Sequence, residues 1–259
     1  MYVCPTDCGR VFGGFSMLEI KNVTKRYSGY KALDEVCLSF PRGEIVGIFG
    51  ENGAGKSTLM KSILGFIGFS GEISLDGEAI SKKNIAKLSF ATSEHSFFPN
   101  LSAASHRDFY REHFERFSDK RFSSLMEFFE LPMHKALKHF STGQKNQFEV
   151  ILALSQGADY ILMDEPFAGN DIFNREDFYK VLLGILEERE TVILSTHLIE
   201  EVSDFIGRAV LIRKGKIIGD VKTSELEEEG KNLISYIKES YNYRGDRVSR
   251  ALNDIIGEE

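Results

Sequence analysis

One short run of the chain has the residue types and the spacing to hold the phosphate groups of a nucleotide. Gly50 and Gly55 are separated by four residues and are followed at once by Lys56 and Ser57. Glycines allow backbone N–H groups to turn toward an anion, the lysine can reach the β- and γ-phosphates, and the serine hydroxyl can ligate Mg²⁺. The predicted nucleotide-binding residues of this run are Gly50, Asn52, Gly53, Gly55, Lys56, Ser57 and Thr58.

The segments that flank this run are those that a phosphate-binding loop needs. Residues 44–49 are largely apolar and indicate a short buried strand, and residues 58–64 continue with apolar side chains at helical spacing. The first amides of a helix and its dipole both favour negative charge. The sequence therefore predicts a strand, a turn and a helix N-terminus that bind a nucleotide.

A second apolar stretch ends in two acids. Residues 160–163 predict a buried strand, and Asp164 and Glu165 follow it directly. An acid at the carboxyl end of such a strand lies beside the phosphate loop, where Asp164 can hold Mg²⁺ directly or through water. Glu165 points elsewhere and can polarise a water for attack on the γ-phosphate, as a general base. The alternative is a surface acid pair that caps the strand.

Composition narrows the class of protein. The 259 residues are 42% hydrophobic and 27% charged, which is typical of one large globular domain or two intimate lobes. Apolar stretches are far shorter than the roughly 18 to 20 residues that span a bilayer, so we expect no membrane crossing. A net charge of −7 without a basic block disfavours nucleic acid as a partner. Three cysteines are too few for a disulfide framework and favour a reducing, cytosolic setting.

Residues 1–16 differ from the rest of the chain, because they are glycine-rich and lack periodicity. We expect a disordered extension, with the folded protein beginning at Met17. Cys4 and Cys8 could instead form half of a zinc site, but only Cys37 remains as a further cysteine ligand.

The remainder divides by pattern. Short β-rich runs occupy residues 17–76, and residues 101–140 carry phenylalanines at helical spacing, which predict core packing rather than a ligand pocket. Strand and helix then alternate from residue 160 to about residue 205, which predicts a parallel sheet. Residues 209–219 predict a β-hairpin, and the acidic run at 225–229 opens a charged tail.

Phe140 to Gln144, followed by an amphipathic run, predicts a serine-capped helix. With the other elements in this order, the chain resembles the nucleotide-binding subunit of ATP-binding cassette (ABC) transporters over about residues 17–220. In that family the segment at Ser141, Thr142, Gly143 and Gln144 is the signature sequence, which meets ATP bound on the other subunit of a dimer. The serine hydroxyl and the helix N-terminal amides suit a γ-phosphate.

The resemblance implies an α/β fold with a P-loop NTPase core, a mixed or parallel sheet, an N-terminal antiparallel β subdomain and a small α-helical subdomain at about residues 95–157. It implies an N-terminal extension at residues 1–16, an ABC ATPase domain at residues 17–223 and a charged C-terminal tail at residues 224–259.

Further residues match family positions. Tyr27 stands where the family stacks an aromatic ring on adenine, and a ring face suits any flat base; an ordinary strand-end aromatic is the alternative. His197 stands where the switch histidine contacts the γ-phosphate and the attacking water. Asp171 matches the loop that crosses the dimer interface. Phe97 and Phe98 lie where family members receive the partner's coupling helix, though they could simply be core.

Some positions depart from the family pattern. Ser93 replaces a glutamine that binds Mg²⁺ and water, so either Glu94 substitutes or a water bridges. Thr142 replaces a signature glycine, which would be awkward if the backbone there needed positive φ. Ala168 and Asn170 replace the usual serine and leucine of the crossing loop. These changes bear on rate and coupling more than on ATP binding.

The resemblance therefore implies an ATP-hydrolysing subunit with ATP and Mg²⁺ as cofactors, in which Glu165, His197 and Lys56 are catalytic and Ser57 and Asp164 hold the metal. It would dimerise with a second copy or a paralogous ATPase subunit and power separate transmembrane permease subunits from the cytoplasmic, inner face of the cell membrane. The pattern is more similar to bacterial export systems than to import systems. Two alternatives stay open: a non-transport ABC ATPase that assembles or remodels soluble partners, and a nucleotide-gated binding module with little turnover.

Overall fold

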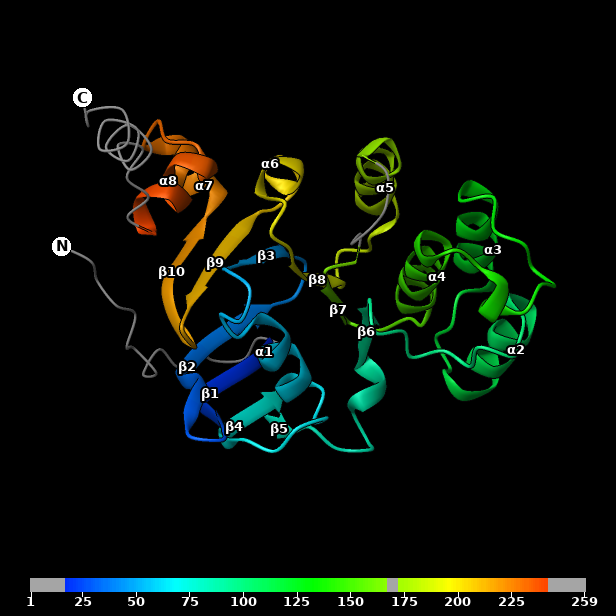
Figure 1. Cartoon of the computed structure of the whole chain (residues 1–259), viewed down its shortest axis with the longest axis horizontal. Helices are drawn as coiled ribbons and strands as arrows, with labels where there is room; N and C mark the ends of the chain where they lie inside the picture. Colours follow the sequence, from blue (N-terminus) through cyan, green and yellow to red (C-terminus); the bar gives the residue numbers. More distant parts are fainter. Residues whose placement is uncertain (1–16, 167–171, 242–259) are drawn as a thin grey trace, which may run out of the picture.

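Two sheets and a group of helices make up the part of the chain that the structure describes (Figure 1). The computed structural model describes residues 17–166 and 172–241, with backbone alone at residues 172–176. The larger sheet has six strands in the order β10-β9-β3-β8-β7-β6, all parallel except for β10, which pairs antiparallel with β9. These strands are β3 (Ile45–Phe49), β6 (Leu88–Thr92), β7 (Tyr160–Asp164), β8 (Thr191–Ser195), β9 (Arg208–Arg213) and β10 (Lys216–Lys222). The predicted parallel sheet and hairpin are confirmed.

The second sheet is antiparallel and has the order β2-β1-β4-β5. It comprises β1 (Met17–Tyr27), β2 (Tyr30–Pro41), β4 (Ser70–Leu75) and β5 (Glu78–Ala79). The predicted strand-rich lobe is therefore present at the N-terminal end of the described chain. Between β3 and β4 lies α1 (Lys56–Ile63), and η1 (Ile85–Lys87) leads into β6.

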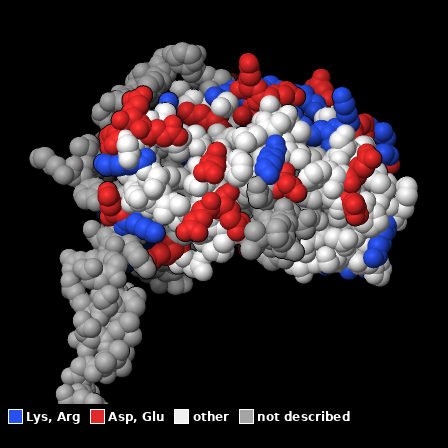
Figure 2. Space-filling model, turned by 90° about the horizontal axis from the view of Figure 1, so that it is seen from above, with Lys and Arg blue, Asp and Glu red and all other residues white. Residues whose placement is uncertain are grey.

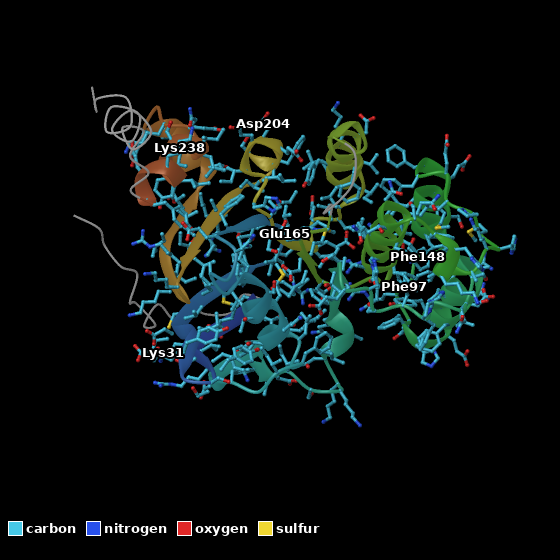
Figure 3. The ribbon with its side chains drawn as sticks, viewed as in Figure 1. Lys31, Phe97, Phe148, Glu165, Asp204 and Lys238 are labelled. Carbon is cyan, nitrogen blue, oxygen red and sulfur yellow. The ribbon has the colours of Figure 1, made fainter. Side chains whose placement is uncertain are left out.

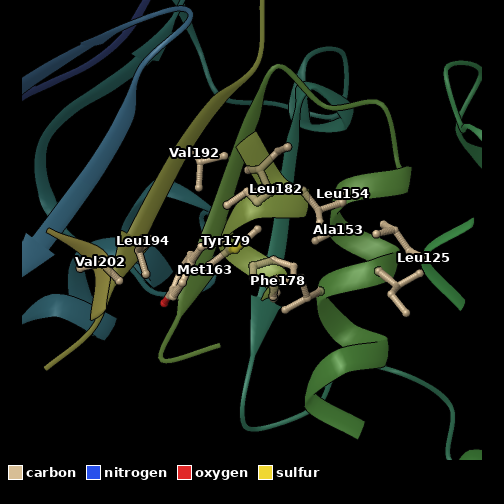
Figure 4. Close-up of a cluster of buried hydrophobic side chains, with 14 of the residues drawn as sticks. Leu125, Ala153, Leu154, Met163, Phe178, Tyr179, Leu182, Val192, Leu194 and Val202 are labelled. Atoms are coloured by element: carbon tan, nitrogen blue, oxygen red, sulfur yellow. The ribbon is translucent and has the colours of Figure 1, made fainter. Parts of the chain in front are cut away.

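The large sheet is covered on both faces, which explains why its central strands β7 and β8 are buried along their whole length. Every residue of β7 and β8 is buried, as expected for parallel strands between two layers. Alternate residues of each strand enter different cores: Leu162 and Ile193 join the core that contains α1 and the small sheet, whereas Met163 and Leu194 join the core of the helices. Figure 4 shows part of the second core, where side chains of α4 (Thr142–Ser155) and α5 (Ile172–Ile185) meet those of β7 and β8.

A helical part lies at one end of the molecule (Figure 1). It contains α2 (Ala103–His113), α3 (Asp119–Phe128), η2 (Leu137–His139) and α4. The prediction that its phenylalanines form a core is confirmed for Phe122, which is fully buried and lies 6.2 Å from the Phe148 ring centroid. Phe109 and Phe128 are exceptions, because they are 39% and 44% exposed. Phe109 stacks on the neighbouring His113 ring, with 4.1 Å between the ring centroids.

The C-terminal part of the described chain is helical and packed. α6 (Ile199–Val202) is a short helix after β8, and α7 (Thr223–Glu228) and α8 (Leu233–Ser240) follow β10. Leu226, Leu233 and Ile237 are buried in the core of the helices. The acidic run at residues 225–229 is thus partly a folded helix, with an apolar side turned to the sheet. No helix in the described ranges is long and apolar enough to cross a membrane.

Several predictions fall on residues that the structure does not describe. These are the extension at residues 1–16 with Cys4 and Cys8, the residues Ala168, Asn170 and Asp171, and the end of the tail at residues 242–259. The predicted domain boundaries stay predictions.

Candidate functional site

The carboxyl ends of three neighbouring strands bring the predicted residues together. Register pairs Ile48 of β3 with Ser195 of β8, and Ser195 with Asp164 of β7. The loops that leave these strands therefore emerge at one edge of the sheet, which is where open α/β sheets bind ligands. The loop at residues 50–55 follows β3, Glu165 follows β7, and His197 follows β8.

The glycines of the phosphate loop are required by their backbone and by their neighbours. Gly53 and Gly55 have φ values of 78° and 117°, which L side chains rarely adopt. A Cβ at Gly50 would lie 2.5 Å from the carbonyl oxygen of Ile212, and one at Gly55 would lie 2.5 Å from that of Ala32. The loop is thus pressed onto β9 and β2. Gly55 is also the N-cap of α1 and provides no side-chain cap, so the first amides of α1 stay available to an anion.

Lys56 lies over this loop. Its side chain is buried, and Nζ donates to the carbonyl oxygen of Gly50 at 2.7 Å and lies 4.0 Å from Oε1 of Glu165. A buried ammonium held by a loop carbonyl and facing a carboxylate is positioned to bind a phosphate, with Glu165 on the other side. Asn52, Gly53 and Ser57 are exposed beside it, whereas Thr58 is half-buried.

Asp164 offers oxygen ligands of the kind that Mg²⁺ prefers. Its carboxylate is 7% exposed and accepts a hydrogen bond from the Ser195 hydroxyl, which fixes one oxygen. Ser57, on the first turn of α1, supplies the second predicted ligand. Within the described residues no cluster of three or more His, Cys, Asp or Glu side chains forms a metal site. The donors fit Mg²⁺, which takes few protein ligands and completes its shell with substrate phosphates and water.

Glu165 has a strained backbone and lies beside both Lys56 and His197. Its φ of 47° places a non-glycine residue in the left-handed region, which costs about 1 to 3 kcal/mol and is frequent at functional sites. The backbone is fixed because the Glu165 amide donates to the Ser195 carbonyl at 3.0 Å. Oε2 lies 2.9 Å from Nδ1 of His197. Figure 3 places Glu165 near the centre of the molecule, between the sheet and the helical part.

Ser141 and Gln144 form a reciprocal cap at the start of α4. The Ser141 hydroxyl accepts from the Gln144 amide at 3.2 Å, and the Gln144 side chain accepts from the Ser141 amide at 3.0 Å. Ser141 is exposed and Gly143 and Gln144 are half-buried, and neither hydrogen bond reaches the phosphate loop. Thr142 is the first helical residue and lacks a positive φ, so the concern about a missing glycine does not apply.

Tyr27 ends β1 and is 37% exposed. Lys25 Nζ lies 4.9 Å from its ring centroid, and the ring of Tyr30 is 6.1 Å away. The structure thus leaves part of the ring accessible to a flat ligand. Tyr27 pairs with Tyr30 of β2. Farther along β2, Ala32 packs against Gly55 of the phosphate loop.

The segment after β6 carries Ser93, at the position where the family has a glutamine, and Glu94. Thr92 is the register partner of Asp164, and the exposed Ser93 follows it. Both carboxylate oxygens of Glu94 lie 2.8 Å from Nζ of Lys61, on α1. Glu94 therefore forms an exposed ion pair with Lys61 on the surface of α1. Farther along, Phe97 packs 5.9 Å from Phe148 (Figure 3), whereas Phe98 is 53% exposed.

Ser195 was missed by the sequence reasoning. It contacts both acids, through its hydroxyl to Asp164 and through its carbonyl to Glu165. Its position at the end of an apolar strand, next to the strand that carries the acids, is the signal that could have found it.

These features together define a phosphate-loop nucleotide-binding domain. They are a parallel sheet, a lysine that donates to a carbonyl of the loop, and two acids at the end of a neighbouring strand. A family model described as ABC transporter matches residues 33–168, more than half of the chain. The chain belongs to the ABC transporter family and carries its ATP-binding domain, as the resemblance implied.

Three relatives illustrate the similarity. The galactofuranose transporter ATP-binding protein YtfR of Escherichia coli K12 is 33% identical over 227 residues, 82% of this chain and 45% of the relative. The ABC transporter ATP-binding protein YtrB of Bacillus subtilis is 30% identical over 217 residues, 82% of this chain and 74% of the relative. The ribose import ATP-binding protein RbsA of Caldanaerobacter subterraneus is 25% identical over 259 residues, 92% of this chain and 52% of the relative. The chain thus spans about half the length of the two sugar-transport relatives.

Solved structures confirm the fold class. An ATP-binding subunit of an ABC transporter superposes with a TM-score of 0.76 at 21% identity, covering 87% of this chain and 100% of that one. cbiO1 from Clostridium perfringens gives a TM-score of 0.68 at 23% identity, covering 93% and 100%. At these identities the likeness shows the fold alone.

Proposed function

We propose that this chain is the ATP-binding and ATP-hydrolysing subunit of an ABC transporter. The observation that supports this most is the meeting of Lys56, Glu165 and His197 at the strand ends, with Asp164 directly beside them. Lys56 is a buried cation, and Asp164 offers oxygen ligands for a metal ion. Glu165 is a carboxylate in contact with the imidazole of His197.

The roles follow from the positions. The loop amides and Lys56 bind the β- and γ-phosphates, and Ser57 and Asp164 would hold Mg²⁺, which neutralises phosphate charge when bound. Glu165 accepts the proton of the attacking water. His197 orients that carboxylate through its 2.9 Å contact, and the family resemblance gives it a contact with the γ-phosphate. The left-handed backbone of Glu165 separates its side chain from that of Asp164, so the two acids take different tasks.

The site is completed by a second chain in this proposal. The exposed start of α4 presents amides and the Ser141 hydroxyl outward, and their cap bonds are made within α4 rather than to the chain's own phosphate loop. A γ-phosphate bound on another copy, or on a paralogous subunit, would meet this helix N-terminus. Each ATP is then held between Lys56 of one subunit and Ser141, Gly143 and Gln144 of the other.

Mixing two inactive variants tests the shared site. Lys56→Ala removes the phosphate-binding charge, and Ser141→Arg blocks the start of α4. Each protein alone should release almost no phosphate from ATP. In a mixture, the Ser141→Arg loop can meet the intact α4 of the Lys56→Ala chain, so activity should return. A Ser141→Arg protein that is fully active alone, or a mixture as inactive as its parents, would contradict the shared site.

A role in transport, with membrane partners and a direction, is the more specific part of the proposal. Family membership, the names of the relatives and the exposed Phe98 support separate transmembrane permease subunits that dock on the helical part, at the inner face of the cell membrane. The export direction expected from the sequence pattern gains no support from the relatives, since RbsA is named as an import protein. Co-purification from detergent extracts, followed by transport into and out of vesicles with the recovered membrane protein, tests partner and direction. Recovery of soluble partners alone would favour the assembly ATPase.

A nucleotide-gated binding module with little turnover is the second candidate. It is favoured by the exposed Ser93, whose short side chain stands where the family has a glutamine. Tight Mg–ATP binding with very slow phosphate release, in a mixture with every natural partner present, would support it.

A further inference from the structure

The C-terminal helix α8 reaches the phosphate loop through a tyrosine at its end. The hydroxyl of Tyr241 lies 3.1 Å from the carbonyl oxygen of Phe49 and 2.9 Å from that of Ile212. Phe49 is the last residue of β3, directly before Gly50, and Ile212 lies in the adjacent strand β9. One hydroxyl proton is therefore shared between two strands at the point where the loop begins.

α8 is held firmly enough to act through this contact. Leu233 and Ile237 are buried in the core that also contains Phe49. The β9–β10 pairing has an irregularity between Ile217 and Gly219, and a Cβ at Gly219 would lie 2.8 Å from the hydroxyl of Tyr236. Gly219 thus makes room for the hydroxyl of Tyr236, and α8 packs closely against this hairpin.

The two carbonyls that Tyr241 holds are in direct contact with the loop. Ile212 O lies against Gly50, since a Cβ at that glycine would be 2.5 Å away. The next carbonyl along the chain, Gly50 O, accepts from Lys56 Nζ at 2.7 Å. A shift of the Phe49 or Ile212 peptide would therefore move the residue that positions Lys56.

The same hairpin holds the other end of the loop. The amide of Gly215, in the turn between β9 and β10, donates to the carbonyl of Ala54 at 2.8 Å. Gly215 has a φ of 77° and lies so close to Ala32 that a Cβ would be 2.8 Å from its carbonyl oxygen. The loop is thus attached to the hairpin at both ends, and the hairpin is attached to α8.

We infer that Tyr241 is a positioning residue for the phosphate loop, through which the docked α8 sets nucleotide affinity. This inference rests on the proposed function, because the loop must bind a nucleotide for its position to matter. Burial and the charge of Glu51 raise the pKa of Tyr241 to about 12, with Arg213 acting in the opposite direction. The hydroxyl therefore keeps its proton, and remains a donor, throughout the working pH range.

Tyr241→Phe tests this, with Tyr160→Phe as the matched control. Tyr160 is fully buried and its hydroxyl donates to a carbonyl, that of Phe40, at 3.0 Å. It begins β7, at the end of the sheet away from the loop. Both variants keep their ring and lose a hydroxyl that donates to backbone carbonyl oxygens, two of them at Tyr241 and one at Tyr160. A general loss of stability should therefore appear in both.

The dissociation constant of Mg–ATP, measured by calorimetry, should rise about three- to tenfold in Tyr241→Phe, as expected for one lost hydrogen bond. It should stay within about twofold of wild type in Tyr160→Phe. Amide hydrogen exchange of residues 50–56, measured without nucleotide, should quicken in Tyr241→Phe alone. The inference is overturned if Tyr241→Phe binds Mg–ATP and exchanges its loop amides as wild type does, or if both variants change equally. Failure of the wild-type protein to bind Mg–ATP would instead overturn the proposed function, and this inference with it.

Discussion

Glu165 and His197 face each other across the ends of adjacent strands, with Oε2 of the carboxylate 2.9 Å from Nδ1 of the imidazole. They are 32 positions apart in the chain and meet because β7 and β8 pair in parallel, with Asp164 opposite Ser195. The contact leaves the other carboxylate oxygen of Glu165 4.0 Å from Lys56 Nζ. In the proposed function, this arrangement directs the general base toward a water that lies between Glu165 and the γ-phosphate.

His197→Ala should slow phosphate release by at least about tenfold, because the base loses the group that orients it. The dissociation constant of Mg–ATP should change by less than about threefold, since the loop and Lys56 keep the phosphates. Steady-state turnover and calorimetric binding measure the two effects. The double change His197→Ala with Glu165→Gln should be no slower than Glu165→Gln alone, because residues that act as a unit are not additive. Equal turnover of His197→Ala and wild type would remove the histidine from the mechanism.

Tyr27→Ala should weaken Mg–ATP binding by about five- to a hundredfold, the range expected when one base loses an aromatic stacking partner. Tyr27→Phe keeps the ring face and should bind as wild type does. Because stacking is indifferent to the base, Mg–GTP affinity should fall by a similar factor. Titration calorimetry on the three proteins distinguishes stacking from an ordinary strand-end aromatic, for which Tyr27→Ala would bind normally.

Lys56→Ala should raise the dissociation constant of Mg–ATP by at least about tenfold, because a buried ammonium facing the phosphates is lost. Lys61→Ala, on the same helix, removes a cation that is paired with Glu94 instead and should leave binding nearly unchanged. Calorimetry on both variants checks this. Unchanged affinity of Lys56→Ala, with a folded protein by circular dichroism, would count against the proposed role of the loop.

Glu149→Gln should change how stability depends on pH. Burial raises the pKa of Glu149 to about 7, despite hydrogen bonds from Ser96 and Phe97 that act in the opposite direction. A carboxyl whose pKa is higher in the folded protein contributes stability that is present at low pH and is lost as pH rises through about 7. Tyr110, which faces Glu149, has a pKa of about 12 and stays neutral.

The free energy of unfolding of Glu149→Gln, minus that of wild type, should therefore increase by about 2 to 3 kcal/mol between pH 5 and pH 8. Urea unfolding at each pH measures it. Glu112→Gln, an exposed change on α2, controls for the loss of one negative charge and should give a flat difference. A flat difference for Glu149→Gln as well would show that the carboxyl titrates as it does in the unfolded chain.

Local pattern was enough to predict the phosphate loop and the two acids, since each directly follows an apolar strand. The glycine spacing was a reliable signal for the loop, because close contacts leave no space for a side chain at Gly50 or Gly55. Parallel strand order then brought the strand ends together. Figure 2 shows acidic and basic side chains interspersed on one face of the molecule.

Contacts between distant segments could not be predicted in the same way. Tyr241 reaches Phe49 across 192 positions, and nothing in an acidic tail indicates that a tyrosine at its end touches the start of a loop. Glu149 accepts from Ser96, 53 positions earlier, although an amphipathic helix pattern gives no reason to bury a carboxylate. Such pairings depend on tertiary packing, which periodicity does not encode.

The most direct test of the central claim compares Glu165→Gln with wild type in two measurements on the same samples. The claim predicts that Glu165→Gln binds Mg–ATP at least as tightly as wild type and releases no phosphate. Once ATP is added, its mass measured by light scattering should be that of a dimer. These results follow because the phosphate cradle and the shared α4 contacts survive while the base is lost. Turnover by Glu165→Gln at the wild-type rate would contradict the assignment of the general base, and with it the account of the site.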